Sequence, residues 1–186
     1  FFLSKEMLYP GSRFRMADEL LEEYIRQLIQ GHHVPDVAVA WQGGEPTLMG
    51  LAFFQRSIEY VEKYRKPGMR VAYTIQTNGT LIDDAWAAFF KQHDFLVGIS
   101  IDGPRAMHDA YRVDKGHQPT FDKVMHGLRV LQQHGVEYNT LTTLHHANAD
   151  QPRAVYHFLR DECASRFQQF IPIIERVEAD DAARAD

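Results

Sequence analysis

Apolar residues along this chain follow two alternating spacings, which predict helices separated by strands. In 17–30, for example, apolar residues recur at intervals of three and four, as in an amphipathic helix, and Gly31 follows as its expected end. Short apolar runs with strand-like spacing lie between the helical segments. The expected helices cover 17–30, 51–64, 83–92, 120–134 and 151–162, and the expected strands cover 37–41, 71–76, 95–101, 136–144 and 167–174.

A helix joins each expected strand to the next, and such repeated βαβ units predict a parallel sheet with right-handed crossovers. An open doubly wound sheet and a barrel both satisfy this α/β pattern. In either architecture, ligands bind at the carboxyl ends of the strands. Polar residues that directly follow a strand are therefore the candidates for a site.

The first such cluster is Gly43-Gly44-Glu45-Pro46-Thr47, which follows the strand at 37–41. Two glycines allow a sharp turn and close approach of another molecule to the backbone. The carboxylate behind them suits a cationic group such as an amino-acid amine. Glycines after a strand also commonly form turns without any ligand, so the cluster gains weight from those that follow it.

The second cluster, Gln76-Thr77-Asn78-Gly79-Thr80, follows the next strand. Asn-Gly between apolar runs is typical of a hairpin. The residues that follow, through Trp86, have the pattern of a helix start, which favours a turn from strand to helix. The Gln and Thr side chains would then point to the strand ends.

The third cluster contains Ser100 and Asp102, which share one face of a strand because side chains alternate with period two. Asp102 could instead cap the loop that Gly103-Pro104 begins, whereas Ser100 has no such local explanation. Arg112 lies in the loop after this strand, and its planar guanidinium is a standard partner for a carboxylate.

Composition narrows the class of protein. The chain has 186 residues, 45% apolar and 24% charged, as expected of one globular domain. A net charge of −5 without a basic stripe argues against nucleic acid as a partner, and no apolar stretch approaches the roughly 18 residues that span a membrane. The single Cys163 fits a reducing, cytoplasmic setting and is expected to be buried. Although there are ten histidines, none has a metal-ligating spacing, so no metal site is predicted.

Taken together, the motifs resemble those of the radical S-adenosylmethionine (SAM) enzymes, and most of all the anaerobic sulfatase-maturating family, the formylglycine-generating, SPASM-type enzymes. The similarity runs from about residue 1 to residue 174. It rests on the order of four motifs, which are 41–47, 76–81, 97–104 and 108–112. The resemblance implies a partial (β/α)6 barrel, a TIM-like partial barrel of parallel strands. In that family a Cys-x3-Cys-x2-Cys loop after the first strand holds a [4Fe–4S] cluster, whose open iron binds SAM.

The resemblance also implies roles for residues of this chain. The amine of SAM would lie against the Gly-Gly-Glu-Pro loop, its carboxylate and ribose would meet the serine and the arginine, and two more polar residues would lie nearby. The implied cofactor-binding residues are Gly43, Gly44, Glu45, Pro46, Gln76, Asn78, Ser100 and Arg112. No catalytic residue is assigned. We expect Glu45→Ala to weaken SAM binding more than folding, as for a rim carboxylate that contributes little to the core.

Several parts of the family pattern are missing. No cluster cysteine is present, because Phe1-Phe2 corresponds to the residues that follow the family's third motif cysteine. The first strand, the region with two auxiliary clusters and the acidic substrate base are also absent. We therefore expect an excised segment, with barrel core at 1–174 and at 175–186 a polar tail that begins a downstream region. This segment would bind no iron–sulfur cluster and perform no turnover.

The implied parent is an oxidoreductase that converts a cysteine or serine of a sulfatase to formylglycine through an adenosyl radical. A peptide partner also agrees with the long polar loop at 103–119, which we expect to frame a wide mouth. Its polar side chains include His108, Asp109, Tyr111, Arg112, Asp114 and Lys115. Hydrogen-bonding groups at the strand rim would be added by Asn139, Thr142, Thr143 and Gln169.

Three alternatives remain open. One is another radical SAM peptide-modifying enzyme with the same barrel. Another is a non-catalytic SAM-binding or protein-interaction module. The last is a (β/α) hydrolase that uses Glu45 and Asp102 as paired carboxylates.

Overall fold

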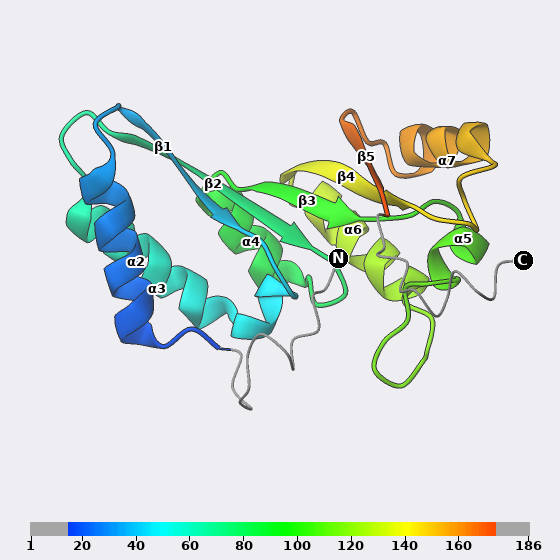
Figure 1. The fold of residues 1–186 in the computed structure, drawn as a ribbon, viewed down its shortest axis with the longest axis horizontal. Helices are drawn as coiled ribbons and strands as arrows, with labels where there is room; N and C mark the ends of the chain where they lie inside the picture. The colour runs from blue at the N-terminus through cyan, green and yellow to red at the C-terminus, as the bar shows by residue number, and fades with distance from the viewer. Residues whose placement is uncertain (1–14, 174–186) are drawn as a thin grey trace, which may run out of the picture.

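The computed structural model describes residues 15–173, which form a five-stranded parallel sheet with helices between the strands (Figure 1). The strands lie side by side in chain order, and each neighbouring pair is parallel. They are β1 (Asp36–Trp41), β2 (Arg70–Thr77), β3 (Leu96–Ser100), β4 (Glu137–Leu144) and β5 (Gln168–Pro172). This arrangement confirms the parallel α/β prediction.

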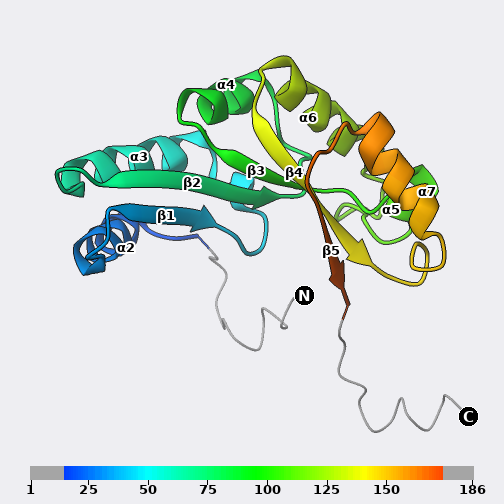
Figure 2. The ribbon, with the colours of Figure 1, turned by 90° about the horizontal axis from the view of Figure 1, so that it is seen from above.

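Helices lie along the outer side of the curved sheet, where α3, α4 and α6 cover β2, β3 and β4 (Figure 2). The helical elements are α2 (Asp18–Gly31), the 3-10 turn η1 (Pro46–Met49), α3 (Leu51–Tyr64), α4 (Asp84–Gln92), α5 (Arg105–Asp109), α6 (Phe121–Gln133), α7 (Pro152–His157) and the π-helical turn η2 (Phe158–Glu162). The sheet curls into part of a barrel, so the partial-barrel prediction is confirmed.

The core lies between the outer face of the sheet and these helices. Along β1, buried and exposed residues alternate, and Trp41 is one of the buried ones. Its indole meets Phe53 and Phe54 edge to face, with ring centroids 5.3 and 5.6 Å apart, and Phe54 meets Trp86 of α4 at 5.2 Å. Such aromatic pairs hold β1, α3 and α4 together through large apolar contacts.

The turn after β2 leads into a helix and not into a hairpin. β2 pairs in parallel with β3, and Gly79 adopts a φ of +74° that favours glycine. Asp83 then begins α4, because its carboxylate accepts a hydrogen bond from the backbone N–H of Trp86 at 3.0 Å. Of the two interpretations of Asn78-Gly79, the strand-to-helix turn is the right one.

Two expected elements differ in detail. The segment 103–119 is not wholly a loop, because it contains α5, a helix too short to show helical periodicity. The expected helix at 151–162 is α-helical only in its first half, α7, and continues as the π-helical turn η2. After this turn the N–H of Cys163 bonds to the carbonyl of Phe158 at 3.1 Å. The expected tail at 175–186 and the end of the last strand at residue 174 lie outside the described residues.

Candidate functional site

The Gly-Gly loop after β1 presents open backbone at the carboxyl end of the sheet. Gly43 and Gly44 have φ values of +105° and +59°, backbone angles that residues with a side chain rarely adopt. Both residues are exposed, and no atom lies within 4 Å of the place where a side chain would begin at Gly43. The main chain here is accessible to a ligand. Pro46, the fourth residue of the loop, is buried at the start of η1.

The Glu45 carboxylate joins the end of β1 to the end of β2. One oxygen accepts hydrogen bonds from the N–H of Thr47 at 3.1 Å, from its hydroxyl at 2.6 Å and from the hydroxyl of Thr77 at 2.7 Å. The other oxygen accepts the backbone N–H of Asn78 at 2.7 Å. Glu45 therefore contributes to folding, contrary to the expectation that a rim carboxylate contributes little.

The remaining rim residues divide into bonded and available groups. The side-chain oxygen of Asn78 accepts the N–H of Thr80 at 3.0 Å and its hydroxyl at 2.8 Å, so it shapes the turn after β2. Gln76 and Ser100 are half-buried, and within residues 15–173 neither side chain makes a hydrogen bond. Both point to the inner face of the sheet. Gly98 of β3 pairs with Gln76, and the space over this glycine is taken by the side chains of Leu141, Asn139 and Gln76 itself.

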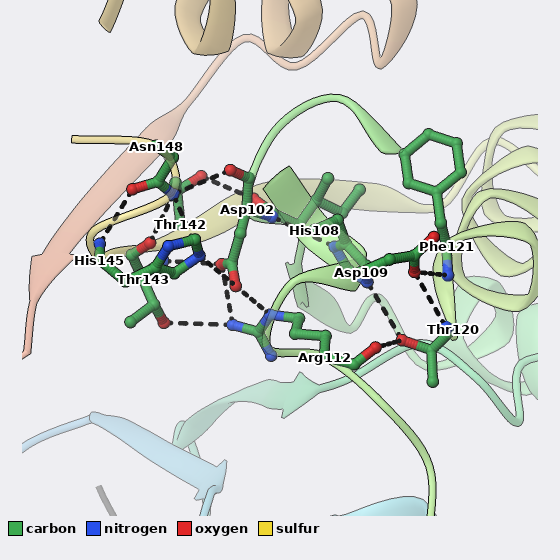
Figure 3. A network of polar contacts seen from close by, with 11 residues as sticks. Asp102, His108, Asp109, Arg112, Thr120, Phe121, Thr142, Thr143, His145 and Asn148 are labelled. Carbon is green, nitrogen blue, oxygen red and sulfur yellow. Dashed lines mark hydrogen bonds and ion pairs between the residues drawn. The ribbon is translucent and has the colours of Figure 1, made fainter. Parts of the chain in front are cut away.

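Arg112 forms a two-pronged ion pair with the buried carboxylate of Asp102. Its Nε lies 2.5 Å from Asp102 Oδ2 and its Nη2 lies 3.0 Å from Oδ1 (Figure 3). Nη2 also donates to the hydroxyl of Thr143 at 3.1 Å. The Asp102 side chain is 2% exposed and that of Arg112 is 25% exposed. Asp102 thus does more than cap a loop, since it binds the arginine expected to meet the cofactor.

His108 is neutral and fully buried beneath this pair. Its Nδ1 accepts the backbone N–H of Asp102 at 3.3 Å, and its Nε2 lies 3.2 Å from the hydroxyl of Thr120. That hydroxyl donates to the carbonyl of Arg112 at 2.6 Å, so His108 Nε2 carries the proton and donates to Thr120. Burial, helped by the charge of Arg112, lowers the pKa of His108 to about 4.

Two further residues attach this loop to its surroundings. The carboxylate of Asp109 accepts the backbone N–H groups of Thr120 and Phe121 at 3.0 and 2.9 Å and so caps α6. The amide nitrogen of Asn148 donates to the carbonyl of Asp102 and to that of Thr143, each at 2.9 Å. The loop is therefore bonded on both sides, to α6 and to the end of β4.

The expected mouth is only partly formed. His108 is buried, so the expectation that it lines a mouth is wrong. Asp109 is half-buried, and one of its carboxylate oxygens is bonded to α6. Thr142 is also buried, and its hydroxyl donates to the carbonyl of Ile101 at 2.7 Å, which removes it from the rim. Asp114 bonds to Lys123 at 2.9 Å. Tyr111 is 58% exposed and stays available.

Sequence reasoning missed Thr120, His145 and Asn148 as members of this network. None of the three lies in a recognisable motif, and each has a partner that the fold brings close. His145, whose ring packs against Tyr111 with centroids 4.6 Å apart, is 8% exposed, and its Nε2 lies 3.6 Å from Asp102 Oδ2. Polar residues at the ends of β3 and β4 were the available signal.

Two other findings concern Cys163 and the lengths of the helices. Cys163 is buried, as expected, and burial raises the pKa of its thiol to about 12. Among residues 15–173, no helix has the length and apolar character needed to cross a membrane.

Comparison with known proteins agrees with this architecture. A serine-type anaerobic sulfatase-maturating enzyme of Bacteroides thetaiotaomicron is 40% identical over 178 residues, which cover 95% of this chain and 42% of that protein. A cysteine-type enzyme of Clostridium novyi is 43% identical over 138 residues, covering 74% of this chain and 37% of that protein. The chain thus spans less than half the length of these relatives.

The fold is likewise similar to a solved structure. Native anSMEcpe with bound AdoMet and Kp18Cys peptide superposes with a TM-score of 0.85 at 34% identity, covering 90% of this chain and 46% of that one. The sequence model described as the radical SAM superfamily matches residues 6–159, which is most of the chain. This chain therefore belongs to the radical SAM superfamily.

Proposed function

We propose that this chain is the SAM-binding part of a radical SAM enzyme and that SAM lies across the carboxyl ends of β1 to β4. The observation that carries the proposal is the meeting, at one end of a curved parallel sheet, of an open glycine backbone, unbonded polar side chains and a held arginine. SAM has an ammonium group, a carboxylate and a ribose, and this set of groups offers a partner for each.

The residues fit the cofactor in chemical type. Open backbone at Gly43 and Gly44 offers carbonyl acceptors for an ammonium group. The hydroxyl of Ser100 and the amide of Gln76 make no hydrogen bond within residues 15–173, so they can bond a carboxylate or ribose. Arg112 offers a charge-assisted bond to a carboxylate.

Each residue then has a binding or orienting role. Glu45 holds the glycine loop against the end of β2, and its own carboxylate is largely satisfied by the protein. Bound together with a [4Fe–4S] cluster, SAM supplies the abstraction of a hydrogen atom from the substrate, and the protein supplies binding, orientation and exclusion of water. Ligands for that cluster are not found in this chain, whose single cysteine is buried.

We further propose that the full-length protein oxidises a cysteine or serine of a sulfatase to formylglycine. Support comes from the relatives, which are named sulfatase-maturating enzymes of the serine and cysteine types. It also comes from native anSMEcpe, which has been solved with the Kp18Cys and Cp18Cys peptides. The exposed Tyr111 beside the proposed cofactor site is a residue that a bound peptide could contact.

The test uses the full-length protein that contains this sequence, reconstituted with iron and sulfide and reduced under anaerobic conditions. It is incubated with SAM and matched sulfatase-derived peptides that differ only in cysteine, serine or alanine at the modified position. We expect SAM cleavage and an aldehyde, trapped with hydrazine and seen by mass spectrometry, on the cysteine or the serine peptide. SAM cleavage without aldehyde on either peptide would remove the sulfatase assignment and leave the radical SAM one.

A further inference from the structure

We infer that Asp102 is a positioning residue, which orients Arg112 so that one amino group of its guanidinium meets the carboxylate of the bound ligand. This inference rests on the proposed SAM site and assigns a role to a residue outside it. Asp102 itself is 2% exposed in its side chain, so it acts through Arg112 and does not touch the ligand.

The guanidinium is largely committed to the protein. Nε and Nη2 both bond to Asp102, and Nη2 also bonds to Thr143 (Figure 3). Within residues 15–173, Nη1 has no hydrogen-bond partner. With a quarter of the side chain exposed, this amino group is the one that remains for a ligand. Because the guanidinium is planar and rigid, the contacts of Nε and Nη2 also fix the direction of Nη1.

Asp102 is itself held on several sides. Its Oδ1 accepts the backbone N–H of Thr143 at 2.8 Å, its carbonyl accepts the amide of Asn148, and its N–H donates to His108. Arg112 is held at its own backbone, where its N–H donates to the carbonyl of His108 at 2.9 Å. Both ends of the ion pair are therefore placed before any ligand binds.

The pairing has an electrostatic consequence that makes the role testable. A buried carboxylate at 2.5 Å offsets most of the charge of Arg112, so the pair attracts a ligand carboxylate less by net charge than an unpaired arginine does. What the pair offers instead is an oriented donor, and preorganisation lowers the entropy lost on binding. Charge and orientation thus predict opposite effects when Asp102 loses its charge. If charge dominates, Asp102→Asn tightens binding of a carboxylate ligand; if orientation dominates, it weakens it.

The experiment measures, by calorimetry, the affinity of the full-length, cluster-loaded protein for two ligands. S-Adenosylhomocysteine carries the amino-acid carboxylate, and methylthioadenosine lacks the whole amino-acid part. We expect Asp102→Asn to lower the affinity for S-adenosylhomocysteine about tenfold and to change the affinity for methylthioadenosine by no more than about twofold. Thr143→Val removes one contact of the arginine and keeps the ion pair. We expect it to lower the affinity for S-adenosylhomocysteine by a smaller factor and again to spare methylthioadenosine. This variant replaces Asp102→Asn in the test if Asp102→Asn does not fold.

The matched control is Asp109→Asn, in the same loop but bonded to α6 and not to the guanidinium. It is expected to affect both ligands equally or neither. If Asp102→Asn lowers the affinity for both ligands equally, the role of Asp102 is merely structural. If the affinity for S-adenosylhomocysteine is unchanged or higher, orientation of the arginine does not matter. Either result overturns the inference. If the unaltered protein binds neither ligand, the proposed function fails as well.

Discussion

At the scale of single residues, the charged groups of the rim are used first to build the site. Glu45 accepts four hydrogen bonds, two within its own turn and two from the end of the neighbouring strand. Arg112 gives two of its three nitrogens to Asp102. A side chain of this kind affects folding and binding together, so its variants need a measurement of each.

Replacing Glu45 by Gln should lower the free energy of unfolding. The amide loses the negative charge and offers one acceptor oxygen in place of two, which leaves the N–H of Asn78 or the hydroxyl of Thr77 without its partner. Hydrogen bonds to charged groups contribute about 1.5–3 kcal/mol, and we expect a loss in that range by denaturant unfolding. The control is Glu62→Gln, an exposed carboxylate paired with Arg65, expected to change stability by no more than about 0.5 kcal/mol. Equal effects of the two variants would contradict the role of Glu45.

His108 should make stability depend on pH. Its pKa in the folded protein is about 4, below the ordinary 6.5, mainly because it is buried and also because Arg112 is near. Between these values the unfolded chain binds a proton that the folded protein does not, so the contribution of His108 is complete above about pH 6.5 and is lost as the pH falls toward 4.

The measurement compares denaturant midpoints of the unaltered protein and His108→Gln across this range. Glutamine does not titrate and keeps an acceptor for the N–H of Asp102. We expect the unaltered protein to lose more stability than the variant as the pH is lowered. Parallel curves for the two proteins would mean that His108 is protonated as easily in the folded protein as in the unfolded chain.

At the scale of elements, α6 approaches the turn after β2 so closely that its Gly127 has no room for a side chain. A Cβ at Gly127 would lie 2.3 Å from the carbonyl oxygen of Gly79, a backbone atom that cannot move aside easily. This close approach explains a glycine inside a helix, where alanine is otherwise favoured by about 1 kcal/mol.

We therefore expect Gly127→Ala to lower the free energy of unfolding despite the gain in helix propensity. The matched control is Gly31→Ala at the end of α2, where a Cβ would meet no atom within 4 Å and φ is not positive. That substitution should be neutral or stabilise by up to about 1 kcal/mol. Thermal or denaturant unfolding of both variants decides the point, and stabilisation by Gly127→Ala would show that α6 can shift away from the turn.

At the scale of the whole molecule, residues 1–186 combine a proposed SAM site with a single cysteine. Cys163 is buried on the way to β5, and its raised pKa keeps it a thiol at neutral pH. Four-iron clusters are held by several cysteine thiolates. We expect anaerobic reconstitution of this chain with iron and sulfide to yield no stoichiometric cluster, measured by absorbance and iron counting. Four irons retained per chain would contradict this expectation.

The sequence by itself determined the order of elements, the parallel sheet and the clustering of polar residues at the strand ends. These follow from local periodicity, since helical and strand spacing are both visible within short windows. Residues of the Gly-Gly-Glu loop, Ser100 and Arg112 were singled out because each lies at the end of a strand or in the segment after one, and their cofactor-binding roles remain a proposal. The partial barrel followed from a family resemblance, because periodicity alone allowed an open sheet as well.

Only the tertiary structure decided which groups the polar side chains bond to. Glu45 meets Asn78 across 33 positions of the chain, and Asn148 meets Asp102 across 46. Such contacts depend on the register and curvature of neighbouring strands, which no local pattern encodes. For the same reason His108, expected at a mouth, is buried beneath an ion pair. Local spacing places a residue on an element, whereas its partner is set by how the elements pack.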